Sequence, residues 1–99
     1  MTPNELYEMF ERCKDASTEN VEITRQPEVF VINFLKDYSD SFYLICGANE
    51  SEIKLDVNIE RLAENITFDD VEKLVYCGVC MRLYGVFKNV NQYRLCFTV

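Results

Sequence analysis

The chain has 99 residues, of which 48% are hydrophobic, 13% aromatic and 27% charged. This length and this apolar share predict one globular domain, residues 1–99, and exclude both an intrinsically disordered chain and a two-domain protein. Histidine is absent, which excludes Ser-His and Cys-His nucleophiles and removes the commonest metal ligand.

Acidic and basic residues are distributed unevenly along the chain. The formal net charge is −7, and all 17 acidic residues precede Lys73. From Lys73 to the end of the chain the basic residues are Lys73, Arg82, Lys88 and Arg94, and this segment contains no acidic residue. A chain that is acidic overall is repelled by polyanions at long range. Nucleic-acid binding would therefore be weak and confined to a local basic patch.

The N-terminal region, residues 1–20, is expected to be a helix and a linker. Thr2 and Pro3 provide a hydroxyl cap and a proline in the first helical turn, so the helix is expected over residues 3–15. Four apolar residues then fall at helical spacing: Leu6, Met9, Phe10 and Cys13. This stripe is expected either to close one end of the β-structure that follows or to pack against a partner helix.

The middle of the chain favours β-structure. Residues 29–35 form a nearly continuous apolar run rich in β-branched and aromatic side chains, which predicts a strand covered on both faces. A second such strand is expected over 41–47, and a short strand over 21–24. Residues 53–59 alternate between apolar and polar side chains, which predicts a third main strand with one wet face.

The last third predicts a helix and a hairpin. Thr67 is a hydroxyl cap for a helix near 67–76, and residues 61–65 are expected to be its connection to the third strand. Strands are expected over 79–88 and 92–99, with a turn at 89–91. Strict alternation would place Met81 and Phe87 on the inner face of the sheet, and Arg82 and Tyr84 on the outer face.

Three meander strands, a helix and a hairpin follow the element order of the OB-fold, a five-stranded barrel. The fold is therefore expected to be mainly β with two helices, as an OB-fold-like antiparallel barrel over residues 28–99 preceded by an N-terminal helix. The segments Val29-Phe-Val-Ile-Asn-Phe-Leu-Lys-Asp, Ser41-Phe-Tyr-Leu-Ile-Cys-Gly and Cys77-Gly-Val-Cys-Met-Arg-Leu-Tyr-Gly-Val-Phe-Lys carry a resemblance. They resemble the small single-domain OB-fold proteins of genome maintenance, such as the smallest subunit of replication protein A, the CST small subunit and the small RecQ-mediated instability subunit.

The five cysteines are scattered through apolar runs, as packed thiols of a reducing compartment would be. Cys77-Gly-Val-Cys80 has the spacing of a redox pair and of half a zinc site. A zinc site would need two further ligands, and a redox pair would need a βαβ context, so packed thiols are the favoured interpretation. No metal site, cofactor or catalytic residue is expected. Without an apolar leader or a membrane-spanning run, the chain is expected to be intracellular, in the nucleus or cytoplasm.

The C-terminal hairpin is the expected contact surface for a nucleic acid or a partner; the alternative is a solvated strand face, or one that pairs with the protein's own acidic first half. Cations that track phosphates and an aromatic ring that stacks on bases are what single-strand binding requires. The residues assigned to this surface are Arg82, Tyr84, Lys88, Gln92 and Arg94. The resemblance implies a non-enzymatic subunit or adaptor of a DNA replication, repair or telomere complex, which acts mainly through protein–protein contacts and binds single strands weakly. The alternative is a small acidic phage- or virus-encoded inhibitor that mimics nucleic acid. Neither hypothesis involves a small-molecule substrate or a membrane.

Overall fold

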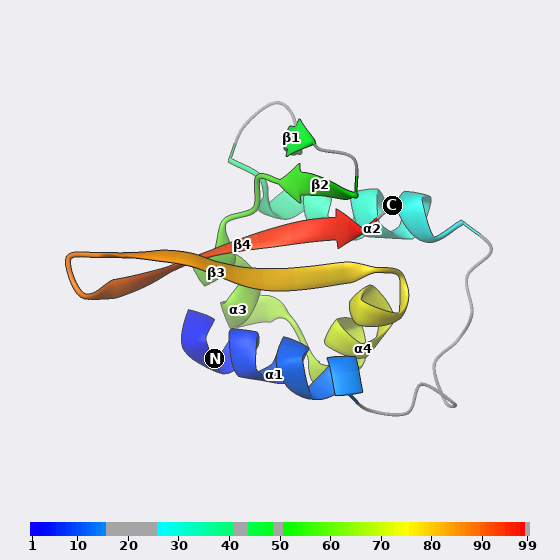
Figure 1. Ribbon diagram of the computed structural model, residues 1–99. Helices are drawn as coiled ribbons and strands as arrows, with labels where there is room; N and C mark the ends of the chain where they lie inside the picture. The colour runs from blue at the N-terminus through cyan, green and yellow to red at the C-terminus, as the bar shows by residue number, and fades with distance from the viewer. Residues whose placement is uncertain (16–25, 41–43, 49–50, 99) are drawn as a thin grey trace.

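The computed structural model describes residues 1–15, 26–40, 44–48 and 51–98. The elements follow in the order α1 (Pro3–Asp15), α2 (Pro27–Leu35), 3-10 helix η1 (Lys36–Tyr38), β1 (Ile45–Ala48), β2 (Glu52–Leu55), α3 (Ile59–Asn65), α4 (Phe68–Tyr76), β3 (Val79–Phe87) and β4 (Val90–Thr98). The strands form one open antiparallel sheet in the order β1-β2-β4-β3 (Figure 1). The expected five-stranded barrel with two helices is therefore wrong, because the described chain has four α-helices and a four-stranded sheet.

The largest error concerns residues 29–35, which form most of helix α2 rather than a strand. Pro27 occupies the first turn of this helix, where its missing N–H costs nothing. Val31 and Leu35, four residues apart, are buried together, whereas Asn33 between them is exposed. That pattern is the period of a helix. The β-branched composition of the run favours a strand, but packing of this one stripe against the core overrides that preference.

The alternating segment 53–59 is also shorter as a strand than expected. Strand β2 ends at Leu55, and the side chain of Asn58 accepts a hydrogen bond from the backbone N–H of Arg61 at 3.0 Å. This N-cap begins α3 over residues expected to be part of the strand and of its connection. Of the other expected strands, 21–24 lies outside the described residues, and so do positions 41–43 of the second.

Two expected helices are confirmed, and both begin with a reciprocal cap. At the start of α4, Thr67 accepts a hydrogen bond from the backbone of Asp70 at 3.2 Å, and Asp70 accepts one from the backbone of Thr67 at 3.1 Å. At the start of α1, Thr2 and Glu5 exchange the same pair of bonds. Each exchange satisfies two backbone donors that a helix start otherwise leaves without partners.

Helices and sheet share a single core. Tyr7 of α1 stacks on Tyr93 of β4 with ring centroids 5.1 Å apart, and α1 also packs along α4 and β3. We call the side of the sheet that faces this core the inner face. The buried members of the core are Leu6, Phe10, Cys13, Val31, Leu35, Leu55, Leu62, Ala63, Ile66, Val71, Leu74, Cys77, Val79, Met81 and Leu95.

The opposite side of β3 and β4, which we call the outer face, carries a different set of side chains. Neighbours along a strand point to opposite faces of the sheet. Val79 and Met81 point to the inner face, so Cys80 and Arg82 of the same strand point to the outer face. Cys96 of β4 is the one buried residue of the described chain that lies outside the main core. The helices that the structure describes pack into the core on the inner face of the sheet. The outer face of the β3–β4 pair is therefore a candidate contact surface.

Candidate functional site

Strands β3 and β4 form a long hairpin whose end projects beyond the rest of the molecule (Figure 1). Phe87 and Val90 are the last paired residues, and Lys88 and Asn89 form the two-residue turn. Both turn residues have positive φ angles, 51° and 64°. A type I′ turn requires that conformation, and its twist matches the twist of the flanking strands. The turn is therefore one position earlier than the sequence predicts, and Val90 belongs to β4.

A bulge at Tyr84 changes which side chains share a face. Leu83 is paired with Tyr93. The next pair joins Gly85 to Gln92, so Tyr84 is an extra residue on β3. Beyond the bulge the alternation of β3 is reversed, and Phe87 lies on the outer face rather than on the expected inner face. The sequence prediction for Phe87 is therefore wrong.

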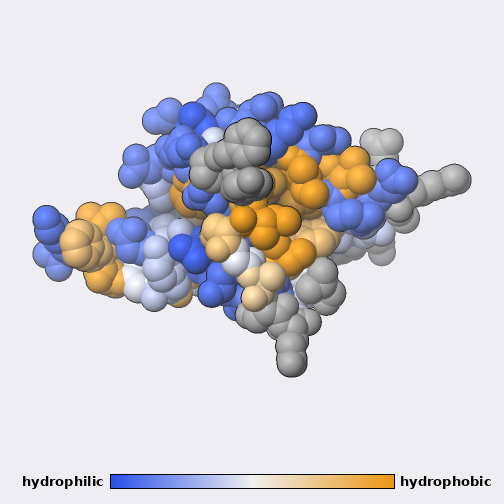
Figure 2. All heavy atoms as spheres, turned by 90° about the horizontal axis from the view of Figure 1, so that it is seen from above, coloured by the Kyte–Doolittle hydropathy of each residue, from blue (hydrophilic) through white to orange (hydrophobic). Residues whose placement is uncertain are grey.

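Hydrophobic side chains cluster on the part of the hairpin that projects, residues 83–91, which we call the hairpin tip. Tyr84, Val86, Phe87 and Val90 are each about 60% exposed: 60%, 64%, 63% and 59%. Figure 2 shows this projecting end with hydrophobic and hydrophilic residues side by side. An exposed apolar group at the end of a projecting element is a feature of interaction sites, because isolated soluble proteins keep such patches small.

The cations of the hairpin contact aromatic rings and a carboxylate. The Arg94 guanidinium lies 5.0 Å from the centroid of the Tyr84 ring, and the Lys88 ammonium lies 5.4 Å from that of Phe87. Arg82 forms an ion pair with Glu52 of β2. The hydrogen bond that Arg82 donates to Glu52 is the main reason that the pKa of Arg82 is raised. These contacts hold both arginines along the outer face rather than extended into solvent.

The five residues assigned to the hairpin from the sequence are only partly brought together. Arg82, Tyr84 and Arg94 share the outer face, and Gln92 lies on the same face opposite Gly85. Lys88 lies in the turn, at the far end of the hairpin.

Sequence reasoning identified Tyr84 but did not assign Val86, Phe87 and Val90 of the hairpin tip, or the ion-pair partner Glu52, to the site. The glycine at position 85 is the signal that could have located the bulge, since glycine inside a strand often accompanies one. With the bulge placed there, the reversed alternation would have brought Phe87 to the outer face.

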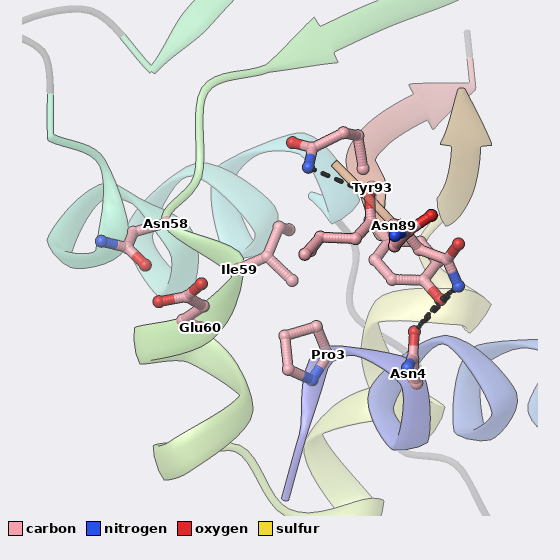
Figure 3. A pocket seen from close by; sticks show the side chains of 10 residues that line it. Pro3, Asn4, Asn58, Ile59, Glu60, Asn89 and Tyr93 are labelled. Atoms are coloured by element: carbon pink, nitrogen blue, oxygen red, sulfur yellow. Dashed lines mark hydrogen bonds between the residues drawn. The ribbon is translucent and has the colours of Figure 1, made fainter. Parts of the chain in front are cut away.

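A groove of about 640 Å³ lies between β4, from the turn residue Asn89 to Tyr93, and the first turns of α1 and α3 (Figure 3). Inside it, Tyr93 donates a hydrogen bond to the side-chain oxygen of Asn4. Asn91 donates to the same oxygen at 3.2 Å and to the Tyr93 hydroxyl at 3.1 Å. The network ties β4 to α1, so the hairpin leaves the body of the protein from a fixed base.

The apolar stripe of α1 lies in the protein's own core. Leu6, Phe10 and Cys13 are at most 3% exposed, and Met9 packs against the same cluster. Burial there raises the pKa of the Cys13 thiol.

The two sulfurs of Cys77-Gly-Val-Cys80 are separated by the sheet, because Cys77 belongs to the core and Cys80 lies on the outer face. Burial raises the pKa of the Cys77 thiol. Among the described residues, no three cysteine or carboxylate side chains come together as a metal site would require. None of the described helices has the length and apolarity needed to cross a bilayer.

Comparisons with known proteins found no matching family model, no matching curated protein and no matching solved structure.

Proposed function

We propose that this protein is a non-enzymatic interaction module that binds another protein through the tip of its β3–β4 hairpin. The observation that carries the proposal is the group of four hydrophobic side chains, each about 60% exposed, at the end of an element that projects from the body. Two of the four, Val86 and Val90, are branched aliphatic residues. They fit an apolar pocket on a protein but cannot stack on nucleobases, which need an aromatic or guanidinium plane.

Charge indicates what surrounds that pocket. The two strands and their turn carry Arg82, Lys88 and Arg94 and no carboxylate, whereas the helices of the body are rich in acidic residues. The basic hairpin would therefore be attracted to an acidic surface while the body is repelled by it. The partner that fits is a protein with an apolar cleft bordered by carboxylates, so that the tip enters the cleft and the body stays outside it.

Single-stranded nucleic acid is a weaker candidate for the same surface. Tyr84 with Arg94 would serve as a stacking platform, but the Arg82 guanidinium is already engaged by Glu52. The net charge of −7 adds long-range repulsion. Direct binding of single strands is therefore expected to be weak and lost at moderate salt.

The test compares three tagged baits in lysate of the source cells, with and without nuclease, and quantifies the recovered proteins by mass spectrometry. The first bait is the native chain, and the second carries Phe87→Thr and Val90→Thr, which place a residue of high strand propensity in each strand position. The control carries Val29→Gln and Ile32→Gln, which remove two hydrophobic side chains, each 44% exposed, from α2.

The proposal predicts a partner that the native and control baits retain after nuclease treatment and that the hairpin variant loses. Its affinity for the purified partner should fall at least about tenfold, the equivalent of 1.4 kcal/mol. Equal recovery by all three baits would contradict docking through the tip. Loss after nuclease would instead support nucleic-acid binding. Recovery of one basic nucleic-acid-binding protein that is insensitive to the hairpin variant would support the acidic-mimic alternative.

A further inference from the structure

Two cysteines that lie 16 positions apart in the sequence face each other across the base of the hairpin. Cys80 of β3 and Cys96 of β4 are direct partners in the antiparallel register. Gly78 accepts a hydrogen bond from the backbone N–H of Thr98 at 2.9 Å, which makes that pair a hydrogen-bonded one. Pair types alternate along an antiparallel ladder, so the cysteine pair two residues on is of the same type, with a Cα separation near 5.5 Å. Disulfides span Cα separations of about 4.4–6.8 Å.

Both side chains lie on the outer face, among charged groups of three strands. Cys80 is half-buried and Cys96 is 3% exposed. Lys54 of β2 is the other cross-strand neighbour of Cys96. The pKa of Cys96 is raised, first by burial and then by the proximity of Cys80 and Glu52, while Arg82 and Arg94 act in the opposite direction.

This pairing differs from the one that the sequence suggests. The Cys77-Gly-Val-Cys80 spacing points to a redox pair within one segment, but Cys77 lies in the core on the inner face. Cys46 is on β1, two strands away from β4 in the sheet order, and its thiol contacts the backbone oxygen of Lys54 at 3.6 Å. Among the described cysteines, Cys80 and Cys96 are the pair that the strand register places opposite each other.

We propose that Cys80 and Cys96 form a dithiol site that a low-molecular-weight disulfide, such as oxidised glutathione, converts reversibly to a cross-strand disulfide. The more exposed Cys80 reacts first: its thiolate attacks one sulfur of the small disulfide, giving a mixed disulfide and releasing one thiolate. The Cys96 thiolate then attacks the sulfur of Cys80, forming the Cys80–Cys96 bond and releasing the second thiolate. The two protons lost by the cysteines end on the two released thiols, so the protein is oxidised and the small disulfide is reduced by two electrons.

Geometry also indicates that the bond is easily reduced again. A relaxed disulfide needs the two Cβ atoms about 3.5–4.5 Å apart. Facing residues in an antiparallel pair have Cβ separations of about 4.5–5.5 Å, with the wider values in hydrogen-bonded pairs. Closing the bond must draw the strands together locally, and strained disulfides have more oxidising potentials than structural ones. The site therefore fits reversible oxidation rather than a permanent crosslink. This inference does not depend on the proposed docking function.

The test treats the fully reduced protein with oxidised glutathione, unfolds it in denaturant while N-ethylmaleimide blocks the remaining thiols, and analyses it by mass spectrometry before and after digestion. Cys80 and Cys96 should escape alkylation with no glutathione attached to either, and a peptide crosslinked between them should appear. Dithiothreitol should restore all five thiols. Cys46→Ser is the matched control, because it removes a thiol on an exposed β1 residue and should leave the crosslink unchanged.

Two variants separate the chemical steps. In Cys96→Ala, the mixed disulfide should accumulate on Cys80 with one glutathione attached. In Cys80→Ala, the buried Cys96 should remain alkylatable after unfolding and carry no glutathione. A mixed disulfide that persists on Cys80 in the native protein would overturn the proposal, as would a crosslink from Cys80 to Cys77 or Cys46. The native-protein peptide map decides the matter even where a variant fails to fold.

Discussion

The assignment of residues 27–35 to a helix can be tested with two substitutions, one at a buried position of the helix and one at an exposed position two residues further on. In the helix Val31 is 2% exposed, whereas Asn33 is exposed. A strand covered on both faces would bury both positions. Val31→Ala and Asn33→Lys therefore give different results for the two structures, because only the strand would place the new ammonium group in the interior.

The cost of Val31→Ala follows from the burial of the side chain. Two methylene equivalents leave the core at about 0.8 kcal/mol each, and the cavity left behind adds roughly 1 kcal/mol. Alanine regains about 0.5 kcal/mol in helix propensity over valine. The free energy of unfolding should therefore fall by about 2 kcal/mol. Asn33→Lys should change it by less than about 0.5 kcal/mol, as exposed substitutions do.

Urea denaturation followed by circular dichroism measures both effects. With a slope of about 1 kcal/mol per molar urea for a chain of this size, Val31→Ala should lower the midpoint by about 2 M. The midpoint of Asn33→Lys should stay within about 0.5 M of the native value. A loss of several kcal/mol for Asn33→Lys would refute the helical assignment, and a neutral Val31→Ala would refute its packing against the core.

Three further predictions concern caps and the hairpin turn. Thr67→Ala removes one half of the capping box of α4, so the free energy of unfolding measured by urea denaturation should fall by about 1 kcal/mol. An unchanged free energy of unfolding would contradict the cap. Lys88→Asn with Asn89→Gly supplies the residues that tolerate positive φ in a type I′ turn, so the protein should gain about 0.5–1 kcal/mol. A loss of stability would argue against that turn type. The pKa of Glu5 is lowered, chiefly by the hydrogen bond from the Thr2 backbone. The ionised Glu5 side chain therefore stabilises the fold at neutral pH, and this contribution is lost as the pH falls below roughly 4. Glu5→Gln lacks the carboxylate, so melting of this variant at different pH values should lack that part of the pH dependence.

Local signals in the sequence predicted the elements whose structure is decided locally. The cap at Thr67 and the stripe of α1 identified two helices, and Gly78 separates α4 from β3 as expected. The run 29–35 could not be assigned in this way, because a short apolar segment fits a strand and a buried helix equally well. Which of the two forms depends on the shape of the core that Val31 and Leu35 enter, and that shape is tertiary information. The barrel was inferred from three meander strands, a helix and a hairpin, and it needed this run as its first strand, so the error extended to the whole architecture.

The candidate site shows the same division between local and tertiary information. The basic character of the hairpin and the alternation of Tyr93 and Arg94 were predicted correctly. One inserted residue, Tyr84, reversed the faces beyond it, and with them the position of Phe87. A bulge leaves only a weak trace in a single sequence, here the neighbouring Gly85. The cross-strand partnership of cysteines likewise depends on the register, which the sequence does not state.

The register of the hairpin is the most direct test of the central claim that the bulge at Tyr84 brings Phe87 to the basic outer face. Close Hα–Hα contacts in antiparallel strands occur in the non-hydrogen-bonded pairs. Nuclear Overhauser spectroscopy of the labelled protein should therefore show an Hα–Hα contact between Leu83 and Tyr93 and another between Val86 and Asn91. An Hα–Hα contact from Gly85 to Asn91, in place of the one from Val86 to Asn91, would mean uninterrupted alternation. That result would return Phe87 to the inner face and contradict the proposed surface.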